Sequence, residues 1–358
     1  MCVIDQCNRV ELLRDLLQAD TPTKIRALLA KLPIAPEGSE YFDRDDPKRK
    51  WVPGKLHWVP VGMQRGNAGR IQLANAGENP LAERLVNAME GLIERARQRE
   101  LLTNPSAPMP QSPREAVERY FNIPPLDQIL ERTPEWERAR ALSKLIRLRV
   151  SRPKGQAKDH FTVRIEDEGI GQTPDHVHKT LLSLSNSSKG DKPYMIGVFG
   201  QGGSSSYHGT RDHSWLISRR APDVHGGENQ GAGWSIVKHV FPKDRRDPYY
   251  AYLAMDEEGA VPYFTAEVAD AANLAHGSTF THIDYDLQHT GVSVVRNLYP
   301  AMNHLLFNPV LGYELYNQGD RPDPMFGNAY RLTFKINRIR KQGQSDDFVD
   351  KTFGPQRM

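Results

Sequence analysis

Two carboxylates and an amide recur at helical spacing in the segment NPLAERLVNAMEGLIERARQRE, which starts at Asn79. Glu83, Asn87 and Glu90 lie at positions i, i+4 and i+7, so a helix would carry all three on one face. The opposite face would carry apolar side chains, namely Leu81, Leu85, Met89 and Leu92. One face therefore suits packing on a sheet, and the other presents hydrogen-bonding groups. An ordinary solvated face has the same pattern.

A second group of polar residues ends a predicted strand. In VRIEDEGIG, alternating Val163 and Ile165 lead to Asp167, and two glycines, Gly169 and Gly171, follow it. A carboxylate accepts hydrogen bonds and can bind an amino group. Glycines, which lack a Cβ, let a planar ring or a phosphate approach the backbone. The alternative is a plain turn, because Asp and Gly are common turn residues.

A third group is the segment GVFGQGG, in which four of the seven residues from Gly197 to Gly203 are glycine. Such a backbone suits close contact with phosphate oxygens. The spacing does not fit the G-x-G-x-x-G pattern of dinucleotide-binding folds. A P-loop is excluded as well, because no Gly-Lys-Ser/Thr follows. Taken alone, the segment is equally consistent with a flexible loop.

The order of these groups along the chain is more specific than any one of them. A helix with E-x-x-x-N, a strand ending in D-x-G-x-G and then G-x-F-G-x-G-G resemble the GHKL, or Bergerat-fold, ATPase superfamily. That superfamily includes gyrase B subunits, MutL proteins, ninety-kilodalton heat-shock chaperones and MORC proteins. A later segment, HGSTFTHIDYD, places Gly277, Ser278 and Thr279 like the Gly-Thr strand of that family. The resemblance covers roughly residues 70–285.

The resemblance implies a role for each matching residue. Glu83 matches the general base for the attacking water, and Asn87 matches the asparagine that holds Mg²⁺. Asp167 matches the aspartate that receives the adenine amino group, supported by a hydroxyl from Ser278 or Thr279. The remaining residues implied at the nucleotide site are Glu90, the pocket-shaping Gly169 and Gly171, the lid residue Lys189, and Gly197, Gly200, Gln201, Gly202 and Gly203.

The chain also departs from the family pattern. Glu90 stands where the family usually has an aspartate, which is one methylene shorter. The interval from Glu83 to Asp167 is long, which we attribute to a helical insertion at about 103–144. The late strand carries Gly-Ser-Thr in place of Gly-Thr, which leaves open whether Ser278 or Thr279 contacts the site.

We therefore expect Mg²⁺-dependent binding and hydrolysis of ATP, with the nucleotide state driving lid closure or dimerisation. The expected partners are ATP, a second copy of the chain and an unidentified protein client or effector. The alternative is a regulatory or interaction module that binds ATP with little hydrolysis, in a nucleic-acid-maintenance or defence complex. Nucleic acid is a further candidate partner because residues 143–158 and 335–342 are basic, although basic residues also protect strand edges.

Composition narrows the class of protein. A net charge of +3 is too small to indicate nucleic-acid binding by itself. The two cysteines, Cys2 and Cys7, make neither a disulfide framework nor a metal site. The N-terminus has no apolar signal sequence, and no window approaches the ~20 apolar residues of a membrane span. These features predict a cytoplasmic protein without a membrane partner.

The pattern of elements predicts an α+β fold, a two-layer sandwich with a mixed, mostly antiparallel sheet and helices on one face. We expect an N-terminal helical segment and linker at 1–55, the ATP-binding domain at 56–290, and a C-terminal helix and strand segment at 291–358. Thr21 and Pro22 should begin an early helix, and 70–76 should form a strand. Residues 145–167 should form a hairpin, and 212–285 should supply several strands, including one at PYFTAEVA.

Overall fold

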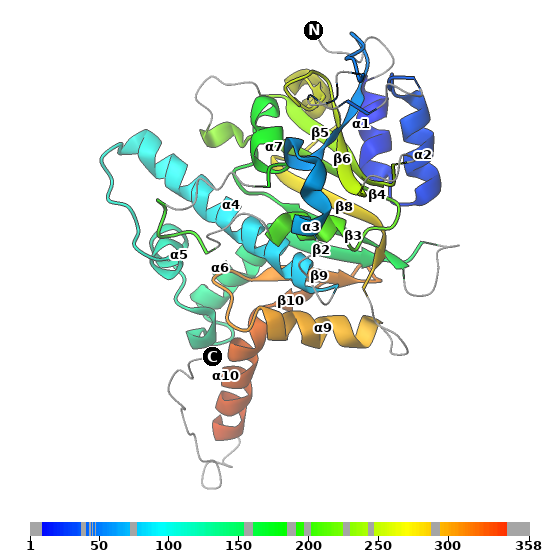
Figure 1. Ribbon diagram of the computed structural model, residues 1–358. Helices are drawn as coiled ribbons and strands as arrows, with labels where there is room; N and C mark the ends of the chain where they lie inside the picture. Colours follow the sequence, from blue (N-terminus) through cyan, green and yellow to red (C-terminus); the bar gives the residue numbers. More distant parts are fainter. Residues whose placement is uncertain are drawn as a thin grey trace.

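The computed structural model describes most of the chain, namely residues 9–36, 41–42, 44, 46, 48–71, 77–153, 160–184, 191–196, 202–224, 230–242, 247–287 and 294–341. Within these residues one large mixed sheet organises the molecule, and helices pack against it (Figure 1). The expected α+β class and the mostly antiparallel, mixed sheet are confirmed.

The sheet has ten strands in the order β1-β6-β5-β4-β8-β3-β2-β9-β10, with β7 beside β5. Among the described strand pairs, β2 and β9 are parallel and the others are antiparallel. The strands span His57–Pro60 (β1), Ile146–Ser151 (β2), His160–Asp167 (β3), His213–Arg219 (β4), Ala232–Val240 (β5), Tyr249–Ala254 (β6), Tyr263–Phe264 (β7), Gly277–Asp286 (β8), Tyr313–Asn317 (β9) and Asp323–Met325 (β10).

The helices differ widely in length. They span Arg9–Gln18 (α1), Pro22–Lys31 (α2), Ala68–Ile71 (α3), Asn79–Thr103 (α4), Pro113–Phe121 (α5), Pro134–Ser143 (α6), Pro174–Thr180 (α7), Ala266–Ala271 (α8), Val294–Leu305 (α9) and Gly327–Lys341 (α10). Short 3₁₀ turns add Val61–Met63 (η1), Arg65–Asn67 (η2), Leu126–Gln128 (η3), Gly202–Tyr207 (η4) and Pro222–Val224 (η5). No helix of the described residues is both long and apolar enough to cross a membrane.

The hairpin expected at 145–167 is formed by β2 and β3, whose register pairs Ile146 with Asp167. Alternation along β3 sends Phe161, Val163 and Ile165 to the face that packs against α4. β8 lies on the other side of β3 and pairs Ser278 with Asp167. Asp167 therefore sits at the end of a central strand, between two partners that fix its position.

The long helix α4 crosses one face of the sheet. Its apolar residues Leu81, Leu85, Met89 and Leu92 are buried, as the sequence predicted, and they pack with the inward residues of β2 and β3. The helix starts at Asn79, with Glu78 as the N-cap, and Pro80 lies in the first turn. The two helices of the expected insertion, α5 and α6, pack beside α4 in the same core.

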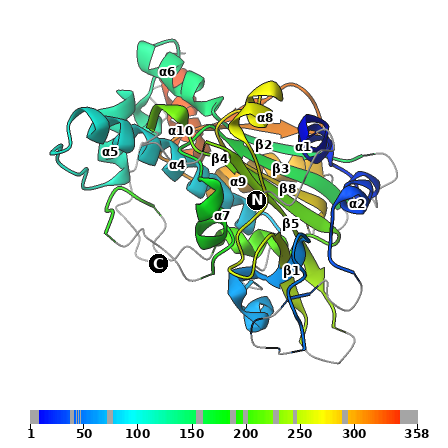
Figure 2. The same ribbon diagram turned by 90° about the horizontal axis from the view of Figure 1, so that it is seen from above.

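The N-terminal helices cover the opposite face of the sheet. Leu13 and Leu16 of α1 and Ile25 of α2 pack against Trp215 and Trp234 of β4 and β5. Seen from above, α1 and α2 lie on one side of the sheet and α4 and α7 on the other (Figure 2). Residues 9–31 thus form a cap on their own chain, and helices flank both faces of the sheet. Helix α2 begins as predicted, because Thr21 Oγ1 accepts a hydrogen bond from the Lys24 backbone N–H at 3.2 Å.

The structure differs from the sequence prediction at two short segments that were expected to be strands. Residues 70–71 end helix α3 instead of starting a strand, and 72–76 lie outside the described residues. In PYFTAEVA, the two-residue strand β7 is followed by the helix α8. The segment beyond 290 joins the same sheet through β9 and β10, because β9 pairs with β2. The basic stretch near the C-terminus is helical, as α10.

Candidate functional site

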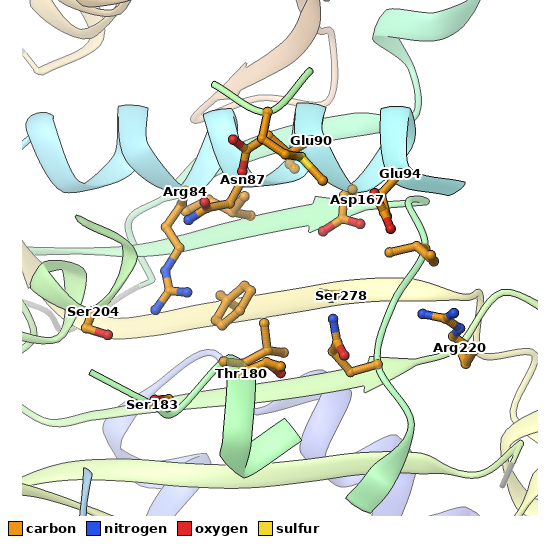
Figure 3. A pocket seen from close by; sticks show the side chains of 18 of the residues that line it. Arg84, Asn87, Glu90, Glu94, Asp167, Thr180, Ser183, Ser204, Arg220 and Ser278 are labelled. Carbon is orange, nitrogen blue, oxygen red and sulfur yellow. The ribbon is translucent and has the colours of Figure 1, made fainter. Parts of the chain in front are cut away.

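A cavity of about 340 Å³ lies between α4 and the sheet (Figure 3). Its walls are formed by α4, by the end of β3 and by the start of β8. Further lining residues come from 170–172, 180–183 and 192–195, and from Ser204 and Arg220. Its polar and charged lining includes Arg84, Asn87, Glu90, Glu94, Asp167, Ser204 and Ser278. Ile165, Ile170, Met195 and Phe280 supply apolar wall. The fold thus brings Asn87 and Glu90 of the long helix, Asp167 at the strand end and Ser278 of the late strand to one cavity.

Backbone N–H groups hold the Asp167 carboxyl in place at the cavity wall by hydrogen bonds. Its Oδ1 accepts a hydrogen bond from the Gly169 N–H at 2.9 Å. The protein packed around the carboxyl raises the pKa of Asp167 to about 7, and hydrogen bonds from the Gly169 and Ser278 backbones offset part of that effect. Asp167 is therefore a carboxyl that can change its protonation near neutral pH beside a ligand-sized space.

The structure decides between the two late-strand hydroxyls. Ser278 and Phe280 line the cavity, whereas Thr279 lines a separate hollow on the opposite face. This follows from the period of two along β8. Ser278 Oγ lies 2.9 Å from Ser218 Oγ on β4, and Ser218 Oγ also accepts the Gln172 N–H at 2.9 Å. A short chain of hydroxyls therefore supports the wall beside Asp167.

The glycines after Asp167 serve the protein's own packing. A Cβ at Gly169 would come within 2.7 Å of the Gly91 carbonyl carbon on α4. Gly171 has φ +62°, and a Cβ there would overlap the Arg219 carbonyl oxygen. Neither glycine is among the residues that line the cavity. Both shape it indirectly, by letting the chain turn tightly between α4 and β4.

The cavity-facing stripe of α4 is shifted from the predicted one. Arg84, Asn87, Gly91 and Glu94 line the cavity together with Ala88 and Glu90. Glu83 is exposed and is not among the lining residues. Asn87 and Glu90 belong to both stripes, so two of the three residues on the predicted face line the cavity. The packing of Leu81 and Leu85 on the sheet sets the rotation of α4 and leaves Glu83 exposed to solvent.

Glu90 and Glu94 hold the segment 191–196 across the cavity. Glu90 Oε1 accepts the Ile196 N–H at 2.7 Å, and Glu94 accepts Lys192 Nζ at 2.8 Å and Tyr194 OH at 2.9 Å. Burial alone would raise the pKa of Glu94, but hydrogen bonds from Lys192, Gln98 and Tyr194 bring it below its usual range. Both carboxylates therefore fix the segment that leads towards the glycine run.

Several lid predictions fall beyond what the structure describes. Lys189, Gly197, Gly200 and Gln201 lie outside the described residues. Gly202 and Gly203 open the 3₁₀ turn η4, which packs against α4 and contributes Ser204 to the cavity. Ser204, the residue directly after the glycine run, therefore lines the cavity.

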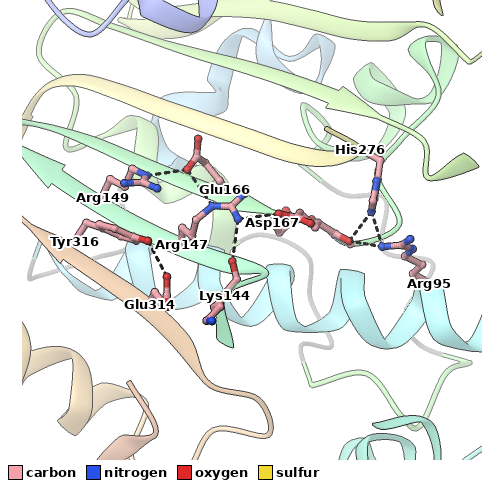
Figure 4. A network of polar contacts seen from close by, with 11 residues as sticks. Arg95, Lys144, Arg147, Arg149, Glu166, Asp167, His276, Glu314 and Tyr316 are labelled. Carbon is pink, nitrogen blue, oxygen red and sulfur yellow. Dashed lines mark hydrogen bonds and ion pairs between the residues drawn. The ribbon is translucent and has the colours of Figure 1, made fainter. Parts of the chain in front are cut away.

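A network of charged side chains surrounds the C-terminal end of β3, near Glu166 and Glu168 (Figure 4). Arg147 donates to Glu168 Oε1 at 2.8 Å, and Arg149 donates to Glu166 Oε2 at 3.0 Å. Arg95 donates to the Glu168 backbone oxygen at 3.0 Å and pairs with Asp223. Two arginines of the basic stretch 143–158 therefore neutralise carboxylates of their own sheet, which weakens the case for a nucleic-acid surface there.

Sequence reasoning missed Arg84, the residue directly after Glu83. Its side chain is only 5% exposed and lines the cavity. The signal was its place between Leu81 and Leu85, both apolar and expected to face the sheet.

No protein-family model matches this chain, and a search of curated proteins finds no match either. Any function must therefore be argued from the site itself.

Proposed function

We propose that this chain binds ATP with Mg²⁺ in the cavity beneath α4 and hydrolyses it, as a GHKL-type switch. The observation that carries the proposal is the juxtaposition of Asp167 and Ser278 on adjacent strands with Asn87 on the facing helix. These residues are distant in sequence, and the motif order alone linked them. A volume of about 340 Å³ falls within the roughly 300–1,000 Å³ usual for small-molecule sites.

The Asp167 end of the cavity suits an adenine ring. An ionised carboxylate accepts the exocyclic amino hydrogen, which specifies an amino-bearing ring over one with a carbonyl at that position. Ile165, Ile170 and Met195 offer apolar contact for a flat heterocycle. Ser278, supported by Ser218, adds a hydroxyl beside the carboxyl. This set of contacts supports recognition of the base.

The Asn87 side of the cavity suits the metal and the phosphates. No group of three or more His, Cys, Asp or Glu that could form a metal cage occurs among the described residues. Magnesium fits such a site, because it usually keeps its waters and takes one or two protein oxygens beside substrate phosphates. Asn87 would supply one amide oxygen. Bound Mg²⁺ would offset phosphate charge.

Hydrolysis is the part of the proposal that rests on Glu83. Glu83 lies one helical turn before Asn87 and is exposed, whereas a general base must come within hydrogen-bond reach of its water. Catalytic contacts are often long before substrate binds, so Glu83 remains our proposed base. Its place outside the cavity favours, as a second candidate, a regulatory module that binds ATP with little turnover.

Lid closure and dimerisation complete the proposed switch. Glu90 and Glu94 tie down residues 191–196, which lead into the glycine run. A nucleotide that contacts this segment would strengthen or weaken the hydrogen bonds that Glu90 and Glu94 make with it. We propose that the nucleotide state sets the position of the lid and, through it, association with a second copy or an effector protein.

The decisive experiment compares Mg²⁺-ATP binding and turnover in the wild type, Glu83→Ala and Glu118→Ala. Glu118 is an exposed glutamate on α5 and serves as the matched control. Glu83→Ala should bind ATP like the wild type and lose about 10²- to 10⁴-fold in turnover. Equal turnover in Glu83→Ala and wild type would refute the assignment of the base. Binding without turnover in the wild type would select the second candidate, and no binding would refute both.

A further inference from the structure

Arg84 is a buried cation for which the described part of the chain supplies no carboxylate partner. It is 5% exposed, and its Nε donates to Ser206 Oγ at 3.2 Å. Its guanidinium carbon lies 3.9 Å from the ring centroid of Phe280 and 5.3 Å from that of Tyr207. Its Nη2 is buried without a hydrogen-bond partner. The structure thus positions a guanidinium firmly and leaves part of it unsatisfied.

Such an arrangement is costly in an isolated protein. A buried charge that lacks a counter-ion loses hydration without regaining an equivalent interaction. Burial accordingly lowers the pKa of Arg84, although an arginine stays charged at neutral pH. Aromatic rings compensate a cation only in part. An anion in the cavity that reaches the guanidinium would recover part of this cost.

The cavity gives that anion a place. Arg84 lines the same cavity as Asp167, and its guanidinium points towards Ser204 (Figure 3). Asp167 lies further along the cavity, on the side of Glu94 and Arg220. Asn87 stands one turn after Arg84 on α4. The cavity therefore has the Arg84 guanidinium and Ser204 at one end, and Asp167 with Glu94 and Arg220 towards the other.

We propose that Arg84 binds the phosphate chain of a nucleoside di- or triphosphate and makes the site select nucleotides over nucleosides. This inference rests on the proposed ATP site and adds a residue and an orientation to it. The base lies towards Asp167, and the phosphates lie towards Arg84, Ser204 and Asn87. A planar guanidinium packed against aromatic rings suits phosphate, because its fixed N–H groups can donate to two oxygens at once.

The test measures binding of tripolyphosphate, ATP and adenosine to the wild type, Arg84→Met, Arg84→Lys and Arg99→Gln. Arg99 is on the same helix and is exposed, so Arg99→Gln removes one charge away from the cavity. Arg84→Met should weaken tripolyphosphate and ATP by about 10- to 100-fold, the loss of a charged hydrogen bond. Its adenosine affinity should stay close to that of the wild type, and Arg99→Gln should match the wild type for every ligand.

Thermal unfolding of the ligand-free proteins separates binding from a purely structural role. Methionine replaces an unsatisfied buried cation with an apolar chain, so Arg84→Met should unfold at or above the wild-type temperature. Tripolyphosphate should raise the unfolding temperature of the wild type more than that of Arg84→Met. If Arg84→Met does not fold, Arg84→Lys provides the comparison, since it keeps the charge but loses the planar fork.

The outcomes for the two proposals are distinct. Wild-type binding of ATP together with equally tight ATP binding by Arg84→Met overturns the role of Arg84 and leaves the ATP site standing. A second outcome is that the wild type binds tripolyphosphate, that Arg84→Met binds it more weakly, and that neither ATP nor adenosine binds. This outcome refutes the ATP site and supports the anion site. Wild-type binding of adenosine without tripolyphosphate or ATP overturns the inference.

Discussion

Replacing Asp167 with asparagine tests the electrostatics at the centre of the proposed site. The carboxyl has an ordinary pKa of 3.8, which its surroundings in the folded protein raise to about 7. The folded chain therefore binds this proton more tightly than the unfolded chain does. The contribution of Asp167 to stability is most favourable below about pH 4, falls as the pH rises towards 7, and levels off above it.

The size of this effect follows from the two pKa values. At about 1.4 kcal/mol per pKa unit, the interval from 3.8 to about 7 corresponds to at most about 4.5 kcal/mol of unfolding free energy. Between pH 5 and pH 8 the same relation gives a loss of about 2.5 kcal/mol. These are upper bounds, because Asp167 is only partly buried and borders the cavity, where water screens its charge.

The assay is urea unfolding of the wild type and Asp167→Asn from pH 5 to pH 8. An asparagine oxygen can still accept the Gly169 N–H, and the amide does not ionise. Asp167→Asn should therefore gain stability relative to the wild type as the pH rises. Asp320→Asn changes an exposed aspartate and should follow the wild-type profile. A constant difference between Asp167→Asn and the wild type across this range would refute the reasoning.

The same variant should lose ATP affinity, because an amide presents N–H groups where the adenine amino group needs an acceptor; calorimetry at pH 8 measures this. Gly171→Ala should destabilise by more than about 1 kcal/mol, because its φ is +62° and Arg219 fills the space. Gly66→Ala, with open space around it, should differ little, and urea unfolding compares the two. Leu85→Ala should cost about 2–5 kcal/mol, since Leu85 is fully buried under α4. Thr21→Ala should cost about 0.5–2 kcal/mol through loss of the cap on α2, measured the same way.

Local pattern predicted the elements that carry the site. The apolar spacing of Leu81, Leu85 and Met89 specified a helix, and alternation through Val163 and Ile165 specified a strand that ends at Asp167. These signals are strong because each depends on which side chains share a face within one element. Weaker local signals failed at 70–71 and in PYFTAEVA, where short apolar runs fit a strand or a helix equally well.

The rotation of α4 shows where local pattern stops. Glu83 and Arg84 are adjacent in sequence and lie four and three residues before Asn87. Either can therefore share a helix face with Asn87. The contact of Leu81 and Leu85 with the sheet turned Arg84 inward and Glu83 outward. That choice depends on the shape of the facing strands, which belong to other parts of the chain.

The sequence by itself therefore determined the helix and the strands that carry the cavity residues, and it named Asn87, Asp167 and Ser278 or Thr279 as residues to bring together. Only the tertiary structure decided that Ser278 lines the cavity and Thr279 does not, and that Gly171 makes room for Arg219. It also decided that Arg84 is buried without a carboxylate partner among the described residues. The physical reason is that periodicity is fixed within a segment, whereas burial and the pairing of charges depend on what other segments place beside it.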